Sequence, residues 1–359
     1  MAFHPPRRTF LAGAAATSGL LLLGRSVLAQ EPLKVGFVYV GPIGDYGWTH
    51  GHELGRQAVD EHFGDTVKTS YVENVAEGPD AERVIRQLAS SGNGLIFTTS
   101  FGFMNSTVRV ARQFPQVKFE HATGYQTAPN LAVYNARFYE GRAVCGAIAG
   151  HVSESGIVCY IASFPIPEVV MGINAFTIAM QKVQPDAQVK VVWVNSWYDP
   201  GKEGDAAKAL IDQGADIICQ HTDSPAPLQV AQERGVHGFG QASDMKAYAP
   251  DAQLTAILDH WGDYYIERVQ AVLDGAWETH SIWWGLKEGM VQMAPYGPAV
   301  TAEAAAAGDA TKEGIIAGTL HPFDGPVENQ AGEVVIAEGE HPSDEELQQM
   351  DWYVQGVQA

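Results

Sequence analysis

The feature that most constrains the fold is a repeated alternation of short apolar segments, rich in β-branched residues, with segments of helical periodicity. KVGFVYV is followed by a predicted helix from about Thr49 to His62, then VKTSYVEN, a predicted helix over 79–90, and GLIFTT. This order is typical of parallel sheets whose strands are connected by helices. The continuously apolar segments GIVCYIA, VKVVWVN and DIICQHT suit strands covered on both faces. We therefore predict an α/β fold, in which ligands bind at the carboxyl ends of the strands.

The N-terminal residues have the three parts of an export signal. Arg7 and Arg8 precede an apolar stretch over 10–23, and the small residues VLA end at Ala29. We expect residues 1–29 to be a twin-arginine signal that is cleaved after Ala29 and directs the folded protein to the periplasm. An uncleaved N-terminal anchor is the alternative, which the shortness of the apolar stretch disfavours. No cysteine stands at the expected cleavage point, so we expect no lipid anchor.

The remaining length predicts two lobes. Removing 29 of 359 residues leaves 330, more than one hydrophobic core usually organises. Near His151 the chain passes from a small-residue helix, EGRAVCGAIAGHV, to a new strand without a Pro- or Gly-rich linker, which indicates a hinge, and a break near 258–262 would return it to the first lobe. The expected N-terminal lobe comprises 30–150 and 260–295, and the expected C-terminal lobe comprises 151–259 and 296–359.

The C-terminal segment has its own local signals. The stretch HPFDGPVENQAGEVVIAEGE predicts a hairpin, and SDEE predicts a capped helix that begins at Ser343. Several crossings between two lobes would make a clamshell that can close on a ligand.

Charge and cysteine usage exclude several classes of function. The chain has 42 acidic and 22 basic residues, a net charge of −20, and the loss of three arginines with the signal would make it 19 − 42 = −23. Nucleic acid is therefore not an expected partner. The three cysteines, Cys145, Cys159 and Cys219, are widely spaced in apolar runs, so we predict buried core residues in place of disulfides or a metal cluster.

No sequence motif nominates a catalytic site. The chain contains no G-x-S-x-G, H-E-x-x-H, C-x-x-C or P-loop motif, and its 12 histidines lack metal-ligand spacing. The loop GPIGDYGWTHGHELG matches no phosphate-binding pattern, because Trp48 stands where a phosphate would need bare backbone. We predict no catalytic residue, no metal and no cofactor.

Aromatic side chains recur at the ends of the predicted strands. Those at four strand ends are Tyr39, Trp48, Phe101, Phe103, Phe164, Trp197 and Tyr198. Each could merely pack its loop, but their recurrence at one structural location favours a site that stacks a planar ring. Polar groups suited to orienting a flat, neutral heterocycle lie between them: Asn135, Asn195, Asp199, Asp244 and Asp259.

Some polar residues also have a structural interpretation. We favour a helix cap over a ligand contact for Asp199, because Asp before Pro at a helix start satisfies free amides. Asp244 could also cap, although we retain it as a candidate. His121 and His221 at strand ends are interpreted as hydrogen-bonded structural residues.

The chain resembles the basic-membrane-protein (BMP) family of substrate-binding proteins of ABC importers, some of which are purine nucleoside receptors. The matching segments are GPIGDYGWTHGHELGRQA, EGRAVCGAIAGHV, VNSWYDPGKEGDAAKALIDQGADII and FDGPVENQAGEVV. The resemblance spans the chain after the signal. It implies a periplasmic-binding-protein type I clamshell of two doubly wound parallel-sheet lobes with a hinge, which closes on a ligand in the cleft.

Departures from the family pattern imply a change of ligand. Trp48 falls on the aromatic that stacks the base, whereas Tyr39 replaces an acid. In GQASDM, Ala242 replaces the first of two aspartates, and Asp244 retains the second. His260 stands where a lysine helps to hold ribose in nucleoside receptors. With bulky Trp261 beside it, the resemblance implies a free purine base, such as adenine.

We therefore predict a periplasmic receptor that captures a purine and delivers it to an ABC permease in the inner membrane, acting as a monomer without catalysis. The predicted ligand-binding residues are Trp48, Tyr39, Phe101, Asn135, Phe164, Trp197, Asp244, His260 and Trp261. The alternatives are a nucleoside receptor of the same type, an enzyme acting on a small periplasmic heterocycle, and a sensor domain.

Overall fold

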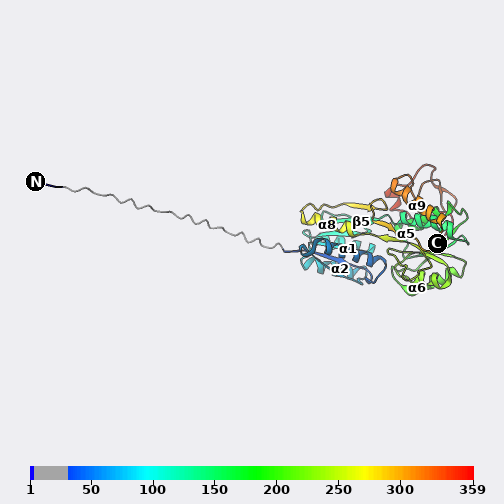
Figure 1. Ribbon diagram of the computed structural model, residues 1–359, viewed down its shortest axis with the longest axis horizontal. Coiled ribbons are helices and arrows are strands. Elements are labelled where there is room, and N and C mark those ends of the chain that lie inside the picture. The colour runs from blue at the N-terminus through cyan, green and yellow to red at the C-terminus, as the bar shows by residue number, and fades with distance from the viewer. Residues whose placement is uncertain (4–30) are drawn as a thin grey trace. The chain divides into compact units, whose positions relative to one another are not determined.

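The structure, a computed structural model, describes residues 1–3 and 31–359. The predicted twin-arginine signal lies outside the described residues, except for its first three. Residues Pro32–Ala359 form one compact unit. Its core is two sheets, one surrounded by α1, α2 and α8 and the other by α5, α6 and α9 (Figure 1).

The first sheet has six strands in the order β11-β5-β4-β3-β1-β2, and every adjacent pair is parallel. Its strands are β1 (Leu33–Val38), β2 (Val67–Val72), β3 (Leu95–Thr98), β4 (Lys118–Ala122), β5 (Leu131–Ala136) and β11 (Ser281–Trp284). Its helices are α1 (Gly47–Phe63), α2 (Pro79–Ser90), α3 (Met104–Gln113) and α8 (Gly262–Leu273). This sheet and these helices form the first lobe.

The second sheet has seven strands in the order β12-β10-β9-β8-β6-β7-β15, and only the β10–β12 pair is antiparallel. Its strands are β6 (Ile157–Ala162), β7 (Gln188–Trp193), β8 (Ile217–His221), β9 (His237–Gly240), β10 (Gln253–Asp259), β12 (Val291–Met293) and β15 (Val357–Gln358). Its helices are α4 (Phe138–Val152), α5 (Pro167–Gln181), α6 (Pro200–Ile211), α7 (Ala226–Arg234) and α9 (Ala302–Ala317). Together they form the second lobe.

Helices cover both faces of each sheet, and the strand sequences explain why. In β1, Val35 and Phe37 join the core cluster that contains α8 residues, whereas Val38 joins the cluster that contains α2 and α3 residues. In β6, Tyr160 and Cys159 likewise belong to different clusters. Since successive side chains of a strand point to opposite faces, a strand covered on both sides must be apolar throughout. The α/β fold with two doubly wound lobes is confirmed.

The lobe boundaries differ from the expected ones. Helix α4, assigned to the first lobe from the sequence, packs against α5 and α9 of the second. A Cβ at Gly146 would lie 2.2 Å from the Phe176 carbonyl oxygen, so the small residues of α4 allow close packing on α5. Strand β12 falls in the range 260–295 that was assigned to the first lobe, yet it pairs with β10 of the second sheet.

Local predictions near the C-terminus are confirmed. Strands β13 (Val327–Glu328) and β14 (Val334–Ile336) form an antiparallel hairpin, and Ser343 caps α10 (Asp344–Leu347) in a capping box with Glu346. The three cysteines are buried and unpaired within the described residues, as expected for core positions.

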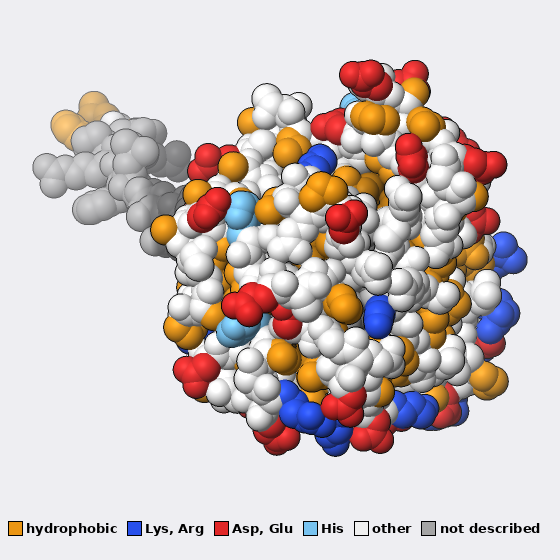
Figure 2. Space-filling view, turned by 90° about the vertical axis from the view of Figure 1, so that its right-hand side faces the viewer, with side chains coloured by type: hydrophobic (Ala, Val, Ile, Leu, Met, Phe, Trp, Pro, Cys, Tyr) orange, Lys and Arg blue, Asp and Glu red, His pale blue; other side chains and the backbone are white. Residues whose placement is uncertain are grey.

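Charged side chains of both signs are spread among hydrophobic ones on the face drawn in Figure 2, where the acidic groups occur around the whole outline. That face therefore carries no broad basic surface of the kind that binds nucleic acid. Among the described residues, none of the helices has both the length and the apolar character needed to cross a membrane.

Candidate functional site

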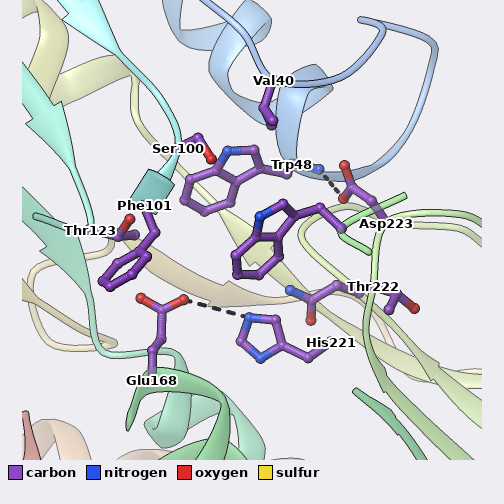
Figure 3. Close-up of a pocket in the computed structure, with 11 residues that line it drawn as sticks. Val40, Trp48, Ser100, Phe101, Thr123, Glu168, His221, Thr222 and Asp223 are labelled. Carbon is purple, nitrogen blue, oxygen red and sulfur yellow. Dashed lines mark hydrogen bonds and ion pairs between the residues drawn. The ribbon is translucent and has the colours of Figure 1, made fainter. Parts of the chain in front are cut away.

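A cavity lies between the two lobes at the carboxyl ends of the strands. The first lobe contributes Val40, Trp48, Ser100, Phe101 and Thr123, and the second contributes Glu168, Trp197, His221, Thr222, Asp223 and Gln241 (Figure 3). Its empty volume, which includes some open solvent, is about 480 Å³. A cavity at strand ends with mixed aromatic and polar walls is typical of a small-molecule site.

Trp48 is held so that its ring, and not its N–H, is available. The indole nitrogen donates to the Thr99 carbonyl oxygen at 2.6 Å. The ring meets His52 edge-on at 4.4 Å between centroids and meets Trp261 in the same way at 5.4 Å. Because the N–H is already used, Trp48 can offer a ligand in the cavity only its π-surface.

The amino end of α1 is capped from the other lobe. No side chain next to the helix in sequence caps it. Instead, the Gly47 amide donates to Ser243 Oγ at 2.6 Å and the Trp48 amide donates to Asp223 Oδ1 at 2.5 Å. Free amides at a helix start need acceptors, so bringing the lobes together satisfies them. Burial raises the pKa of Asp223 to about 7, against the opposing effect of the Trp48 amide.

Further hydrogen bonds join the lobes around the cavity. The Trp197 indole nitrogen donates to Glu77 at 3.2 Å, the hydroxyls of Tyr46 and Tyr198 lie 3.3 Å apart, and Tyr248 donates to Asp45 at 2.6 Å. The structure therefore has the lobes closed on the cavity.

His221 and Glu168 form a polar pair at the wall of the cavity, with His221 Nε2 and Glu168 Oε1 3.6 Å apart (Figure 3). Burial lowers the pKa of His221, so the ring is neutral near pH 7. The sequence interpretation of His221 as purely structural missed its place in the cavity wall.

Six of the predicted ligand-binding residues lie in or beside the cavity. Trp48, Phe101 and Trp197 line it, and Phe164 packs against Trp197 with 5.0 Å between ring centroids. Trp261 is buried behind Trp48. Asn135 lines a neighbouring cavity of about 820 Å³ empty volume, which shares Phe101, Thr123 and Glu168 with the first.

Three predicted residues do not reach the cavity. Tyr39 is buried and donates to Glu53 at 3.1 Å, because it continues the β1 face that carries Val35 and Phe37 into the core. Asp244 is exposed and accepts from the Lys246 amide at 3.0 Å, which caps a turn.

His260 is the third of these residues, and it is exposed. Its neighbour Asp259, the last residue of β10, points inward: its carboxylate is buried, and neither oxygen has a hydrogen-bond partner among the described residues. β10 is covered on both faces and ends at Asp259, so Asp259 is still inside the fold, whereas His260 lies just beyond the strand and is exposed. Burial and the nearby Asp223 raise the pKa of Asp259.

The interpretation of Asp199 as a helix cap is confirmed, because its carboxylate accepts from the Lys202 amide at 3.1 Å at the start of α6. Sequence reasoning missed Asp223, Gln241, Glu168 and Thr222. Thr222, Asp223 and Gln241 directly follow strand ends, which was the available signal, whereas Glu168 lies in the first turn of α5.

The Bmp family, described as "ABC transporter substrate-binding protein PnrA-like", matches residues 33–316. The chain is 56% identical over 342 residues to a purine-binding protein of Brucella abortus, covering 95% of this chain and 97% of that one. It is 38% identical to a putative ABC transporter glucose-binding protein of Haloferax volcanii, over 91% of this chain and 81% of the relative.

Solved structures support the fold alone. An ABC transporter solute-binding protein from Aeropyrum pernix K1 superimposes with a TM-score of 0.70 at 17% identity, covering 89% of this chain and 98% of that one. An ABC transporter solute-binding protein from Conexibacter woesei superimposes with a TM-score of 0.65 at 21% identity, covering 80% of this chain and 98% of that one.

Substrate-binding proteins of ABC importers act outside the cytoplasmic membrane, where they bind small molecules and deliver them to a membrane permease. They are not enzymes, so the alternative of an enzyme is wrong. The chain belongs to the Bmp family of ABC transporter substrate-binding proteins.

Proposed function

We propose that the cavity binds a purine, with the free base preferred over the nucleoside. The observation that carries this proposal is an interlobe cavity with three aromatic side chains, Trp48, Phe101 and Trp197, in its walls. The Trp48 indole presents its face, and Asp223 and Glu168 provide carboxylates that accept from ring and amino N–H groups. The Brucella abortus relative, which is named as purine-binding, supports the same ligand class.

The preference for the base keeps the argument from Trp261 but loses the one from His260. His260 is exposed and does not line the cavity, so it does not determine whether the site prefers a base or a nucleoside. Trp261, 1% exposed, packs edge-on against Trp48, so bulk fills the space behind the stacking ring. Of the residues that the structure describes, no lysine or arginine lines the cavity, so none of them offers a cationic donor to ribose hydroxyls there.

The nucleoside receptor is the second candidate, favoured by the neighbouring cavity. That cavity opens beyond Phe101 and is lined by Asn135, Ser281 and Gln348 among others, which could pair with hydroxyl groups. A base stacked on Trp48 could extend a sugar in this direction.

Titration calorimetry with adenine and adenosine separates the two candidates. We expect adenine to bind at least about tenfold more tightly, or about 1.4 kcal/mol. Equal or tighter binding of adenosine would make the nucleoside receptor the better description. Binding of glucose with no binding of any purine would refute both and align the chain with the relative named as glucose-binding.

We infer that the protein reaches the periplasm through the twin-arginine route. Support comes from the sequence alone, from Arg7 and Arg8 before the apolar stretch. Replacing both arginines with lysine should leave the precursor in the cytoplasm, as judged by fractionation and immunoblotting. Normal amounts of processed protein in the periplasm would refute this route without affecting the binding proposal.

A further inference from the structure

Arg142 on α4 is a buried cation without a carboxylate partner among the described residues. The side chain is 0% exposed and its guanidinium lies 5.6 Å from the Tyr160 ring centroid. One terminal nitrogen donates to Cys219 Sγ at 3.2 Å, the other donates to the Gln241 side-chain oxygen, and Nε has no partner. The Gln241 oxygen is therefore the one oxygen acceptor that Arg142 has within the described part of the chain.

This contact fixes which way the Gln241 amide points. A guanidinium carries only donors, so the amide must turn its oxygen toward Arg142 and its NH2 group away. Gln241 is 5% exposed and lines the cavity. Its Nε2 makes no hydrogen bond to any described residue, and it is not among the fully enclosed polar atoms that lack a partner. The NH2 group therefore has access to the cavity.

The other polar groups in the wall make this donor distinctive. The indole nitrogens of Trp48 and Trp197 already donate to Thr99 and Glu77. Ionised carboxylates can only accept, and hydroxyl groups can rotate to do either. Gln241 is thus a donor whose direction is fixed by a group outside the cavity.

We propose that Gln241, oriented by Arg142, is a specificity-determining residue that donates a hydrogen bond to an acceptor on the edge of the bound ring. With the Glu168 carboxylate as an acceptor in the same cavity, Gln241 would distinguish rings by the order of donors and acceptors along that edge. A site built to make such a bond rejects an analogue that lacks the acceptor, because the buried donor is then left unpaired. This inference rests on the proposed function, in which a purine ring occupies the cavity.

The test uses deaza analogues of adenine in which one ring nitrogen at a time is replaced by CH. Calorimetry on the unmodified protein should find one analogue that binds about tenfold more weakly than adenine, which identifies the acceptor. In Gln241→Leu, adenine and that analogue should bind equally.

Gln241→Glu is a second variant that tests whether weaker binding in Gln241→Leu comes only from loss of folding. Its carboxylate would pair with Arg142, so the thermal midpoint should not fall, yet the side chain has no N–H to donate. We expect adenine affinity to drop about tenfold, with the discrimination against that analogue lost.

Three results would contradict the inference in distinguishable ways. If the unmodified protein binds adenine and every deaza analogue equally, no ring acceptor is read. If discrimination persists unchanged in both Gln241 variants, another residue reads the acceptor. If the folded protein binds no purine at all, the proposed function fails together with the inference.

Discussion

Replacing Gly47 with alanine is expected to prevent full closure of the lobes and to weaken ligand binding by about a hundredfold or more. Gly47 lies where α1 meets the second lobe, with φ at +81°. A Cβ there would lie 2.5 Å from Asp223 Oδ1 and 2.8 Å from the Asp223 carbonyl oxygen. The side chain could rotate, but the carbonyl could move only with its loop.

The reason for a large effect is that the clash exists only in the closed form. A left-handed conformation costs an alanine roughly 1–2 kcal/mol whether the lobes are open or closed, so it affects stability more than closure. The interlobe overlap instead penalises the ligand-bound state alone and reduces affinity directly. A hundredfold loss corresponds to about 2.8 kcal/mol.

Gly44→Ala is the matched control in the same loop. Gly44 also has positive φ, +51°, but no atom lies within 4 Å of its added Cβ. The control should lose stability similarly while keeping its affinity. Calorimetry measures the affinity and the stability, and small-angle scattering with and without ligand measures the closure of the lobes. Affinity in Gly47→Ala as high as in Gly44→Ala would mean that the Gly47–Asp223 approach is not part of the bound state.

Much of the fold could be predicted because it is encoded locally. Apolar runs bounded by helical segments predicted the parallel sheets, and the helix over 79–90 matches α2, Pro79–Ser90. The lobe boundary near 150 could not be read in the same way. Whether α4 packs on the first or the second sheet depends on partners such as α5, and local sequence gives no signal for that choice.

The site was predictable to the level of strand ends and not to the level of side-chain direction. Placing Trp48, Phe101 and Trp197 required only that they follow strands. Choosing Asp259 over His260 required the exact end of β10, because the strand ends at Asp259 and the next residue is exposed.

Other features of the site depend on long-range contacts. Asp223 caps a helix 175 residues earlier, and the orientation of Gln241 depends on Arg142, which is 99 residues away in the chain. Such pairs become visible only when the two lobes are assembled.

Trp48→Ala should reduce purine affinity roughly 30-fold, or by about 2 kcal/mol or more, if the indole stacks the bound ring. Much of this loss is the removal of aromatic area, and an offset aromatic pair adds about 0.5–1.5 kcal/mol beyond burial. Trp48→Phe should recover part of the affinity because it restores a π-face, although not the hydrogen bond to Thr99.

The matched control is Trp283→Ala, because Trp283 is also partly buried and its indole nitrogen donates to a backbone carbonyl, that of Ala136, at 2.9 Å. Trp283 does not line the cavity. Both truncations should lower the thermal midpoint through lost packing, so a change in midpoint alone carries no information about stacking. Calorimetry at a temperature where both variants are folded should find weakened binding only in Trp48→Ala. Equal affinities in the two variants would remove Trp48 from the binding site, since a lost stacking partner must appear as a difference between them.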